Sequence, residues 1–129
     1  MFIALELSLE IVRELKDVRA RVAKFDRGLE DEIRRAARSV ALNVSEGSQR
    51  VGRDRLHAYR LAAGSAAELH TAMRIALAEG YVGESGPLMT KIDREIRLLW
   101  GLTHPRGSSA TTSPSPDRGA PGSPAPDQS

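Results

Sequence analysis

Apolar residues recur at spacings of three and four along most of the chain, and no segment alternates in the way a β-strand does. The first segment with this period has charged residues between its apolar positions, which are Leu7, Ile11, Leu15, Val18, Val22 and Phe25. Such a pattern is typical of an amphipathic helix that buries one face in a bundle. The period is interrupted at 26–28 by Asp-Arg-Gly, which predicts the end of this helix.

A second predicted helix opens on three acidic residues at 30–32, which suit the positive end of the helix dipole. Its apolar positions follow in steps of four, three, four and three: Ile33, Ala37, Val40, Val44 and Gly47. Because several of these residues are small, we expect a neighbouring helix to approach closely.

A connection at 50–54 precedes a third predicted helix over 55–79, with apolar positions Leu56, Tyr59, Ala63, Ala66, His70, Met73 and Leu77. Gly64 lies inside this helix at a cost of about 1 kcal/mol relative to alanine, which favours close packing there. Gly80 lies just beyond its end, where a positive φ is often needed. A fourth helix is predicted over 86–102, with Pro87 in its first turn and a core stripe of Leu88, Ile92, Ile96 and Leu99.

Four such helices joined by short turns predict an all-α fold, an antiparallel up-down-up-down four-helix bundle, over residues 1–104. Residues 105–129 contain six of the seven prolines of the chain and have no apolar periodicity. This segment cannot bury enough apolar surface to offset the entropy of ordering, so we expect a disordered C-terminal tail.

Composition excludes several classes of protein. The chain has no cysteine, which excludes disulfides and thiolate metal sites and fits a reducing, cytoplasmic location. No apolar run approaches the ~20 residues of a membrane span, so we expect no membrane partner.

The net charge of +2 hides an asymmetry along the chain. Residues 33–60 contain seven arginines against two acidic residues, Glu46 and Asp54. A concentrated positive field attracts phosphates through a salt-sensitive, sequence-independent attraction. The same cluster is also expected of a solvated helix face whose arginines pair with carboxylates on neighbouring helices or subunits. Spacing alone does not separate these two interpretations.

No constellation of catalytic or metal-binding residues is apparent. His57 and His70 are thirteen residues apart on one predicted helix, too far to share a metal, and no Glu-x-x-His repeat supplies a di-metal site. Neither Ser45 nor Ser65 has spaced His and Asp partners, and 47–52 matches no phosphate-binding loop. We therefore expect no enzyme, no metal and no cofactor.

Polar residues occur beside the apolar stripe of the second helix at Ser39, Asn43 and Glu46, with Arg35 one turn earlier. A buried amide or carboxylate must be hydrogen-bonded, and an interior carboxylate favours an arginine partner. We interpret these four residues as a strip that fixes helix register or a subunit contact. The alternative is that they line a groove for a ligand.

Residues 33–47 read IRRAARSVALNVSEG, and two further elements follow in order, LAAGSAAEL at 61–69 and ALAEGY at 76–81. Together they resemble the pattern of a family of four-helix-bundle proteins. This family includes the 23S rRNA intervening-sequence proteins and the accessory variability protein of diversity-generating retroelements. The similarity extends over about residues 5–102. Ala41 stands where the family often has proline, and 5–9 lack its aromatic-rich stretch.

The resemblance implies a ring-like homopentamer and, in the retroelement branch, a basic surface that binds nucleic acid and a reverse transcriptase. Motif positions that we interpret as helix packing or subunit contact are Arg35, Ser39, Asn43, Glu46, Gly47, Gly64, Ser65, Glu68 and Leu69. Candidates for phosphate contact are Arg34, Arg38, Arg50 and Arg53, followed by Arg55, Arg60 and Arg74.

We therefore expect a non-enzymatic oligomer that binds the backbone of structured RNA or DNA. An aromatic content of 4% favours phosphate contact over base stacking. The alternative is a structural or protein-docking scaffold, for example for a reverse transcriptase, whose arginines satisfy acidic groups such as those at 30–32.

Overall fold

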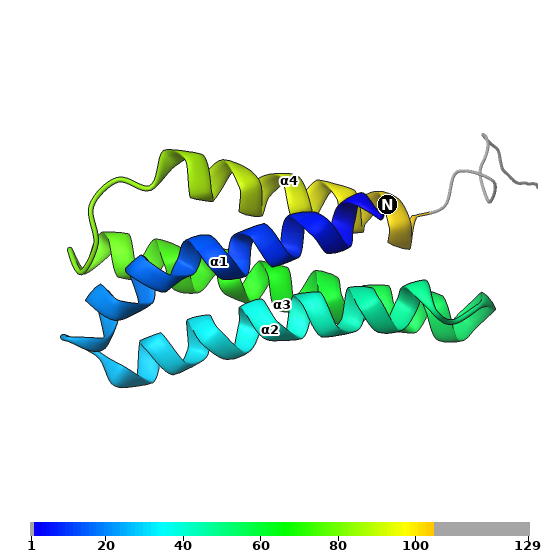
Figure 1. The fold of residues 1–129 in the computed structure, drawn as a ribbon, viewed down its shortest axis with the longest axis horizontal. Coiled ribbons are helices and arrows are strands. Elements are labelled where there is room, and N and C mark those ends of the chain that lie inside the picture. Colours follow the sequence, from blue (N-terminus) through cyan, green and yellow to red (C-terminus); the bar gives the residue numbers. More distant parts are fainter. Residues whose placement is uncertain (1, 105–129) are drawn as a thin grey trace, which may run out of the picture.

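The computed structural model describes residues 2–104, which form four helices. These are α1 (Ile3–Ala23), α2 (Arg27–Ser48), α3 (Gly52–Ala78) and α4 (Gly86–Thr103). Each helix runs antiparallel to the one before it, and α4 returns to contact α1, so the four helices form a closed bundle (Figure 1). Two clusters of buried apolar residues fill its interior. The predicted all-α four-helix bundle is confirmed. The predicted tail over 105–129 lies outside the described residues.

The ends of the helices follow from local chemistry. Asp26 is the N-cap of α2, and its carboxylate accepts a hydrogen bond from the backbone N–H of Leu29 at 2.9 Å. The α2–α3 connection is shorter than predicted, because α3 already begins at Gly52, which has φ 60°. Gly80 follows α3 with φ 77°, as its position predicted.

The core face of α2 is the one that the sequence predicted. All five of its predicted apolar positions are buried, and Gly47 packs against the ring of Tyr59 on α3. A Cβ added to Gly47 would lie 2.4 Å from Cε1 of Tyr59, so only glycine fits this approach. The expected close contact of α2 with a neighbouring helix is therefore present.

The core face of α3 is turned relative to the prediction. Tyr59, Ala66 and Met73 are buried as expected, but other predicted positions are only half-buried, and the core instead takes Ala62, Leu69, Ala72 and Ala76. Alanines flank the stripe on both sides, so the apolar arc is wide and its period does not fix its centre. Gly64 is exposed on the outer side of α3, where nothing else in residues 2–104 lies within 4 Å of an added Cβ. Its expected close packing within the bundle is therefore absent.

The stripes of α1 and α4 also differ in part from the prediction. Phe25 lies beyond the end of α1, is 63% exposed and stacks on Tyr81 with ring centroids 5.2 Å apart. On α4, Leu88, Ile92 and Leu99 are buried as predicted, but Ile96 is half-buried and Glu95 takes the interior position. Within residues 2–104, no helix combines the length and the hydropathy that a membrane span needs.

Candidate nucleic-acid interface

The seven arginines predicted to contact phosphate differ in what their guanidinium groups touch. Arg34 and Arg50 each form an ion pair within α2 or at its end, with Asp31 and Glu46 respectively. These carboxylates neutralise part of the positive charge and compete with a phosphate for the two guanidinium groups. Arg34 and Arg50 are therefore less available for phosphate binding than the sequence alone indicates.

Arg55, near the start of α3, forms hydrogen bonds to the end of α2. Its Nε donates a hydrogen bond to the carbonyl oxygen of Gly47 at 3.1 Å, and its Nη2 donates one to that of Ser48 at 3.5 Å. Carbonyls in the last turn of a helix have no partner within the helix, and a cation there complements the helix dipole. This structural role has no signal in the sequence, because the eight-residue separation crosses a turn of unknown geometry.

The remaining four candidates, Arg38, Arg53, Arg60 and Arg74, are exposed. None of them forms an ion pair with another residue of the 2–104 region. Arg53, Arg60 and Arg74 are seven and fourteen residues apart, so they share one side of α3, which we call the outer α3 face. At 1.5 Å per residue they extend over roughly 30 Å of the helix axis. His57 lies on this face between Arg53 and Arg60, and small residues lie between Arg60 and Arg74.

The polar residues along α2 and α3 form one hydrogen-bonded cluster. Ser65 Oγ donates to Ser39 Oγ across the two helices at 2.7 Å. Asn43 Nδ2 donates to the same Ser39 Oγ at 3.1 Å and to the Ser39 carbonyl at 2.9 Å. These three residues thus link α2 to α3 beside the Gly47–Tyr59 contact.

Arg35 and Glu46 do not join this cluster. Arg35 is exposed and pairs with Asp31 at 2.9 Å and with Glu32 at 3.1 Å, while Glu46 pairs with Arg50. Side chains on a helix point toward its N-terminus, so the long Arg35 reaches the preceding turn rather than Ser39. Hydrogen bonds from Arg35 and Arg34 hold the pKa of the Asp31 carboxyl below its usual value.

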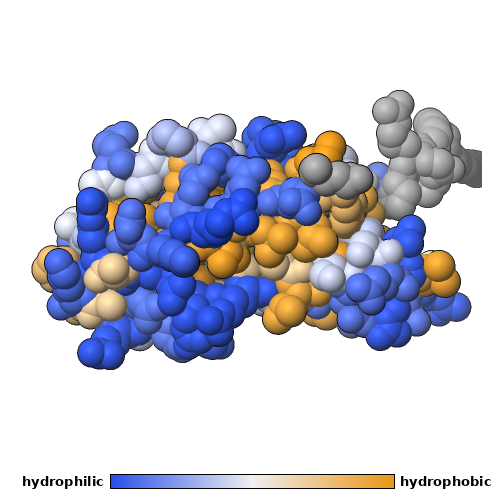
Figure 2. All heavy atoms as spheres, in the orientation of Figure 1, coloured by the Kyte–Doolittle hydropathy of each residue, from blue (hydrophilic) through white to orange (hydrophobic). Residues whose placement is uncertain are grey.

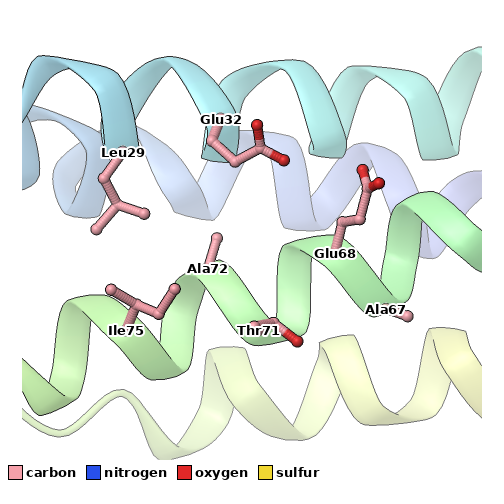
Figure 3. A pocket seen from close by; sticks show the side chains of 7 residues that line it. All are labelled: Leu29, Glu32, Ala67, Glu68, Thr71, Ala72 and Ile75. Carbon is pink, nitrogen blue, oxygen red and sulfur yellow. The ribbon is translucent and has the colours of Figure 1, made fainter.

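A groove of about 350 Å³ lies along α2 and α3 (Figure 3). Leu29 and Ile75 face each other at one end, and the carboxylates of Glu32 and Glu68 extend into the space between the two helices. Leu69, the neighbour of Glu68, is buried in the core. Because the groove carries negative charge, it does not favour phosphate, although Ala67 and Thr71 of its lining also border the outer α3 face.

The three histidines lie in three different environments. His70 is half-buried, and its Nε2 lies 3.0 Å from Asp93 Oδ1, so the pair joins α3 to α4. His57 is exposed, and His104 stacks on Trp100 with ring centroids 4.1 Å apart. Across the described part of the chain, no three His, Asp or Glu side chains lie close enough together to hold a metal ion.

The fold and its basic α3 define the class of protein as a small helical bundle with an exposed cationic surface. Residues 2–101 match the family described as 23S rRNA-intervening sequence protein, and the chain belongs to this family. Its fold is similar to the crystal structure of a protein of unknown function from the S23 ribosomal protein family of Bacteroides thetaiotaomicron. The TM-score is 0.72 at 16% identity, over 79% of this chain and 99% of that one. No match was found among curated proteins.

Proposed function

We propose that this protein is a non-enzymatic, oligomeric nucleic-acid-binding accessory protein that contacts the backbone of RNA or DNA. The observation that carries the proposal is the outer α3 face, where Arg53, Arg60 and Arg74 are exposed and form no ion pair within residues 2–104. Guanidinium groups suit phosphate because their planar donors match its oxygens. A spread of roughly 30 Å fits a polymeric backbone better than a single phosphate.

Binding by this face is expected to be independent of base sequence. The nearest aromatic residue of the helix, Tyr59, is buried, and the exposed Trp100 lies on α4 and stacks on His104. On α3 itself, therefore, no exposed Phe, Tyr or Trp side chain accompanies the arginines. Affinity should come from phosphate contacts and fall steeply with added salt.

We infer that the protein self-associates, into the ring-like homopentamer that the family resemblance implies. Apolar side chains remain exposed on α1 and α2, with Ile3 53% and Leu42 69% exposed, and apolar residues show through the hydrophilic surface in Figure 2. Contacts between copies would cover such residues. A ring would also present several outer α3 faces to one nucleic acid and raise affinity through avidity. Light scattering at micromolar concentration tests this directly, and a monomer would contradict it.

The test of nucleic-acid binding is the double charge reversal Arg53→Glu and Arg60→Glu. Affinity for a structured RNA and for duplex DNA is measured by fluorescence anisotropy between about 50 and 200 mM salt. We expect at least about tenfold weaker binding and a salt slope smaller by about two, one for each lost phosphate contact.

The matched control is Arg13→Glu and Arg21→Glu, which makes the same charge change at exposed positions of α1 that form no ion pair within residues 2–104. The control should retain the wild-type salt slope. Equal losses in both variants, or binding that does not depend on salt, would contradict a specific role of the outer α3 face.

The groove along α2 and α3 favours a second candidate function, a scaffold that docks a protein such as a reverse transcriptase. Its apolar end at Leu29 and Ile75 and its carboxylates at Glu32 and Glu68 suit a segment with apolar and basic side chains. Co-purification with a co-expressed reverse transcriptase, and its loss on Glu68→Lys, would favour the scaffold if the arginine reversals leave nucleic-acid binding unchanged.

A further inference from the structure

Glu95 of α4 is a carboxyl group inside the bundle. Its residue is 1% exposed, and neither side-chain oxygen has a hydrogen-bond partner in the described residues. The position follows from spacing, because Ile92 lies three residues before it and Leu99 four residues after it, and both are buried. The sequence period therefore places Glu95 on the core stripe, although its residue type argues for the surface.

Side chains from the other three helices surround this carboxyl: Ser8 and Ile11 from α1, Ala37 and Val40 from α2, and Ala66 and Leu69 from α3. None of them is charged or titratable. Ser8 is the single polar side chain among them, and its hydroxyl already donates to the carbonyl oxygen of Leu5 at 2.7 Å. With its hydrogen engaged in that bond, Ser8 supplies no donor to the Glu95 carboxyl, which an ionised carboxylate would require.

The electrostatics agree with this geometry. Burial raises the pKa of the Glu95 carboxyl to about 8, and the positive charge of Arg94 on the same helix opposes this only in part. Arg94 itself is exposed to solvent. An ionised carboxyl without a hydrogen-bond donor or cation in contact is strongly disfavoured in a closed interior.

The space beside Glu95 is too small for a ligand. It amounts to about 10 Å³, near the lower limit for a single water molecule, so a hydrated cation or an organic ligand does not fit. The Glu95 carboxyl can therefore exchange a proton with solvent, but it cannot bind a larger ligand.

We propose that Glu95 is a proton switch within the bundle: the packed fold holds it as the neutral acid, and loss of the proton loosens α4 from the other three helices. The switch goes beyond the proposed function and does not depend on it. The physical reason is that a carboxylate at this position gains hydration only if α4 moves away from α1, α2 and α3.

The direction of the pH dependence follows from linkage. In the unfolded chain the carboxyl ionises near its ordinary value of 4.5, and in the folded chain at about 8. Between these values the unfolded state binds fewer protons, so stability falls as pH rises, by about tenfold in the folding equilibrium constant per pH unit. The contribution of the neutral Glu95 carboxyl to stability is fully present below pH 4.5 and no longer changes above pH about 8.

The test compares urea unfolding of the full chain with that of Glu95→Gln from about pH 5 to about pH 9. Glutamine resembles the neutral acid and does not titrate. The folding equilibrium constant of the wild type should fall relative to the variant by about tenfold per pH unit up to pH about 8. The control Glu84→Gln, at an exposed position of the α3–α4 loop, should follow the wild type. Parallel curves for the wild type and Glu95→Gln would overturn the proposal.

A measurement on the wild type decides the matter even if Glu95→Gln fails to fold. Carbon-13 NMR of the glutamate side-chain carboxyls should reveal one that titrates at about 8, and amide exchange in α4, corrected for base catalysis, should accelerate above that pH. Titration of every glutamate carboxyl below pH about 6 would overturn the proposal.

Discussion

Two regions of the bundle accommodate polar side chains in opposite ways. Along the α2–α3 contact, Ser39, Asn43 and Ser65 form a cluster in which each side chain has a hydrogen-bond partner. Beneath α4, Glu95 is more deeply buried and has none in the described residues. The first arrangement fixes how two helices meet at little cost, whereas the second lowers the stability of the fold once the carboxyl ionises.

Some carboxylates at the surface have a partner, as the residues of the α2–α3 cluster do and Glu95 does not. Lys91 of α4 lies 3.2 Å from Glu10 and also pairs with Glu14, so one lysine joins α4 to α1 from outside the core. The hydrogen bonds that Lys91 donates to the carboxylates of Glu14 and Glu10 raise the pKa of Lys91, which keeps it charged. Charged contacts thus hold α4 to α1 at the surface, while the carboxyl of Glu95 has no such partner among the described residues of the interior.

The largest effect is expected where α2 and α3 are closest. In Gly47→Val the new side chain would overlap the buried ring of Tyr59, and we expect a loss of about 2–3 kcal/mol in the free energy of unfolding. Urea unfolding monitored by circular dichroism measures this loss. Because Tyr59 is buried whereas the arginines of the outer α3 face are exposed, any folded variant should keep its salt-dependent nucleic-acid binding.

Gly64→Ala is the matched control for that substitution. An added Cβ meets nothing within 4 Å in residues 2–104, so alanine should be neutral or stabilise the helix by up to about 1 kcal/mol. A loss similar to that of Gly47→Val would show that Gly64 makes a close contact with another copy of the chain, which light scattering of the variant would reveal.

A smaller effect is expected from the cluster itself. Ser65→Ala removes the donor to Ser39 and should cost about 1 kcal/mol, and Ser39→Ala should cost somewhat more because Asn43 also loses an acceptor. A double-mutant cycle of Ser39→Ala and Ser65→Ala should give a coupling energy of at least about 0.5 kcal/mol. Ser48→Ala serves as control, since that hydroxyl bonds only a carbonyl of its own helix. Additive effects would mean that the link contributes nothing to stability.

The comparison also explains which parts of the structure the sequence predicted. In α2 the predicted apolar positions follow each other in regular steps of four and three, with charged residues on the opposite side, and all five are buried. In α3 alanines on several sides leave the pattern ambiguous, so the predicted stripe was rotated away from Leu69 and Ala72. Periodicity fixes the orientation of a helix only when its apolar arc is narrow.

The sequence predicted that arginines form the candidate site, but it did not predict which of them are held by other residues of the bundle. The sequence indicated an arginine cluster at 33–60, yet Arg34 and Arg50 are paired and Arg55 caps α2. Which arginines remain free depends on side-chain directions and on the turn between α2 and α3. Glu95 could have been found from its spacing to Ile92 and Leu99, but an unpaired buried carboxyl contradicts the expectation that charged residues face water.

The smallest expected effect concerns Asp31, whose pH response has the opposite sign to that of Glu95. Its pKa is lowered by hydrogen bonds from Arg35 and Arg34, so its contribution to stability is present above its ordinary value of 3.8 and is lost as pH falls through the folded value. Asp31→Asn should therefore unfold at slightly lower temperature than the wild type at neutral pH, and the difference should vanish at strongly acidic pH. Asp54→Asn is the control, because Asp54 lies in the first turn of α3 and forms no ion pair within residues 2–104. Thermal unfolding across the acidic range measures both variants, and a difference that persists at the lowest pH would mean that the charge of Asp31 is not what stabilises the start of α2.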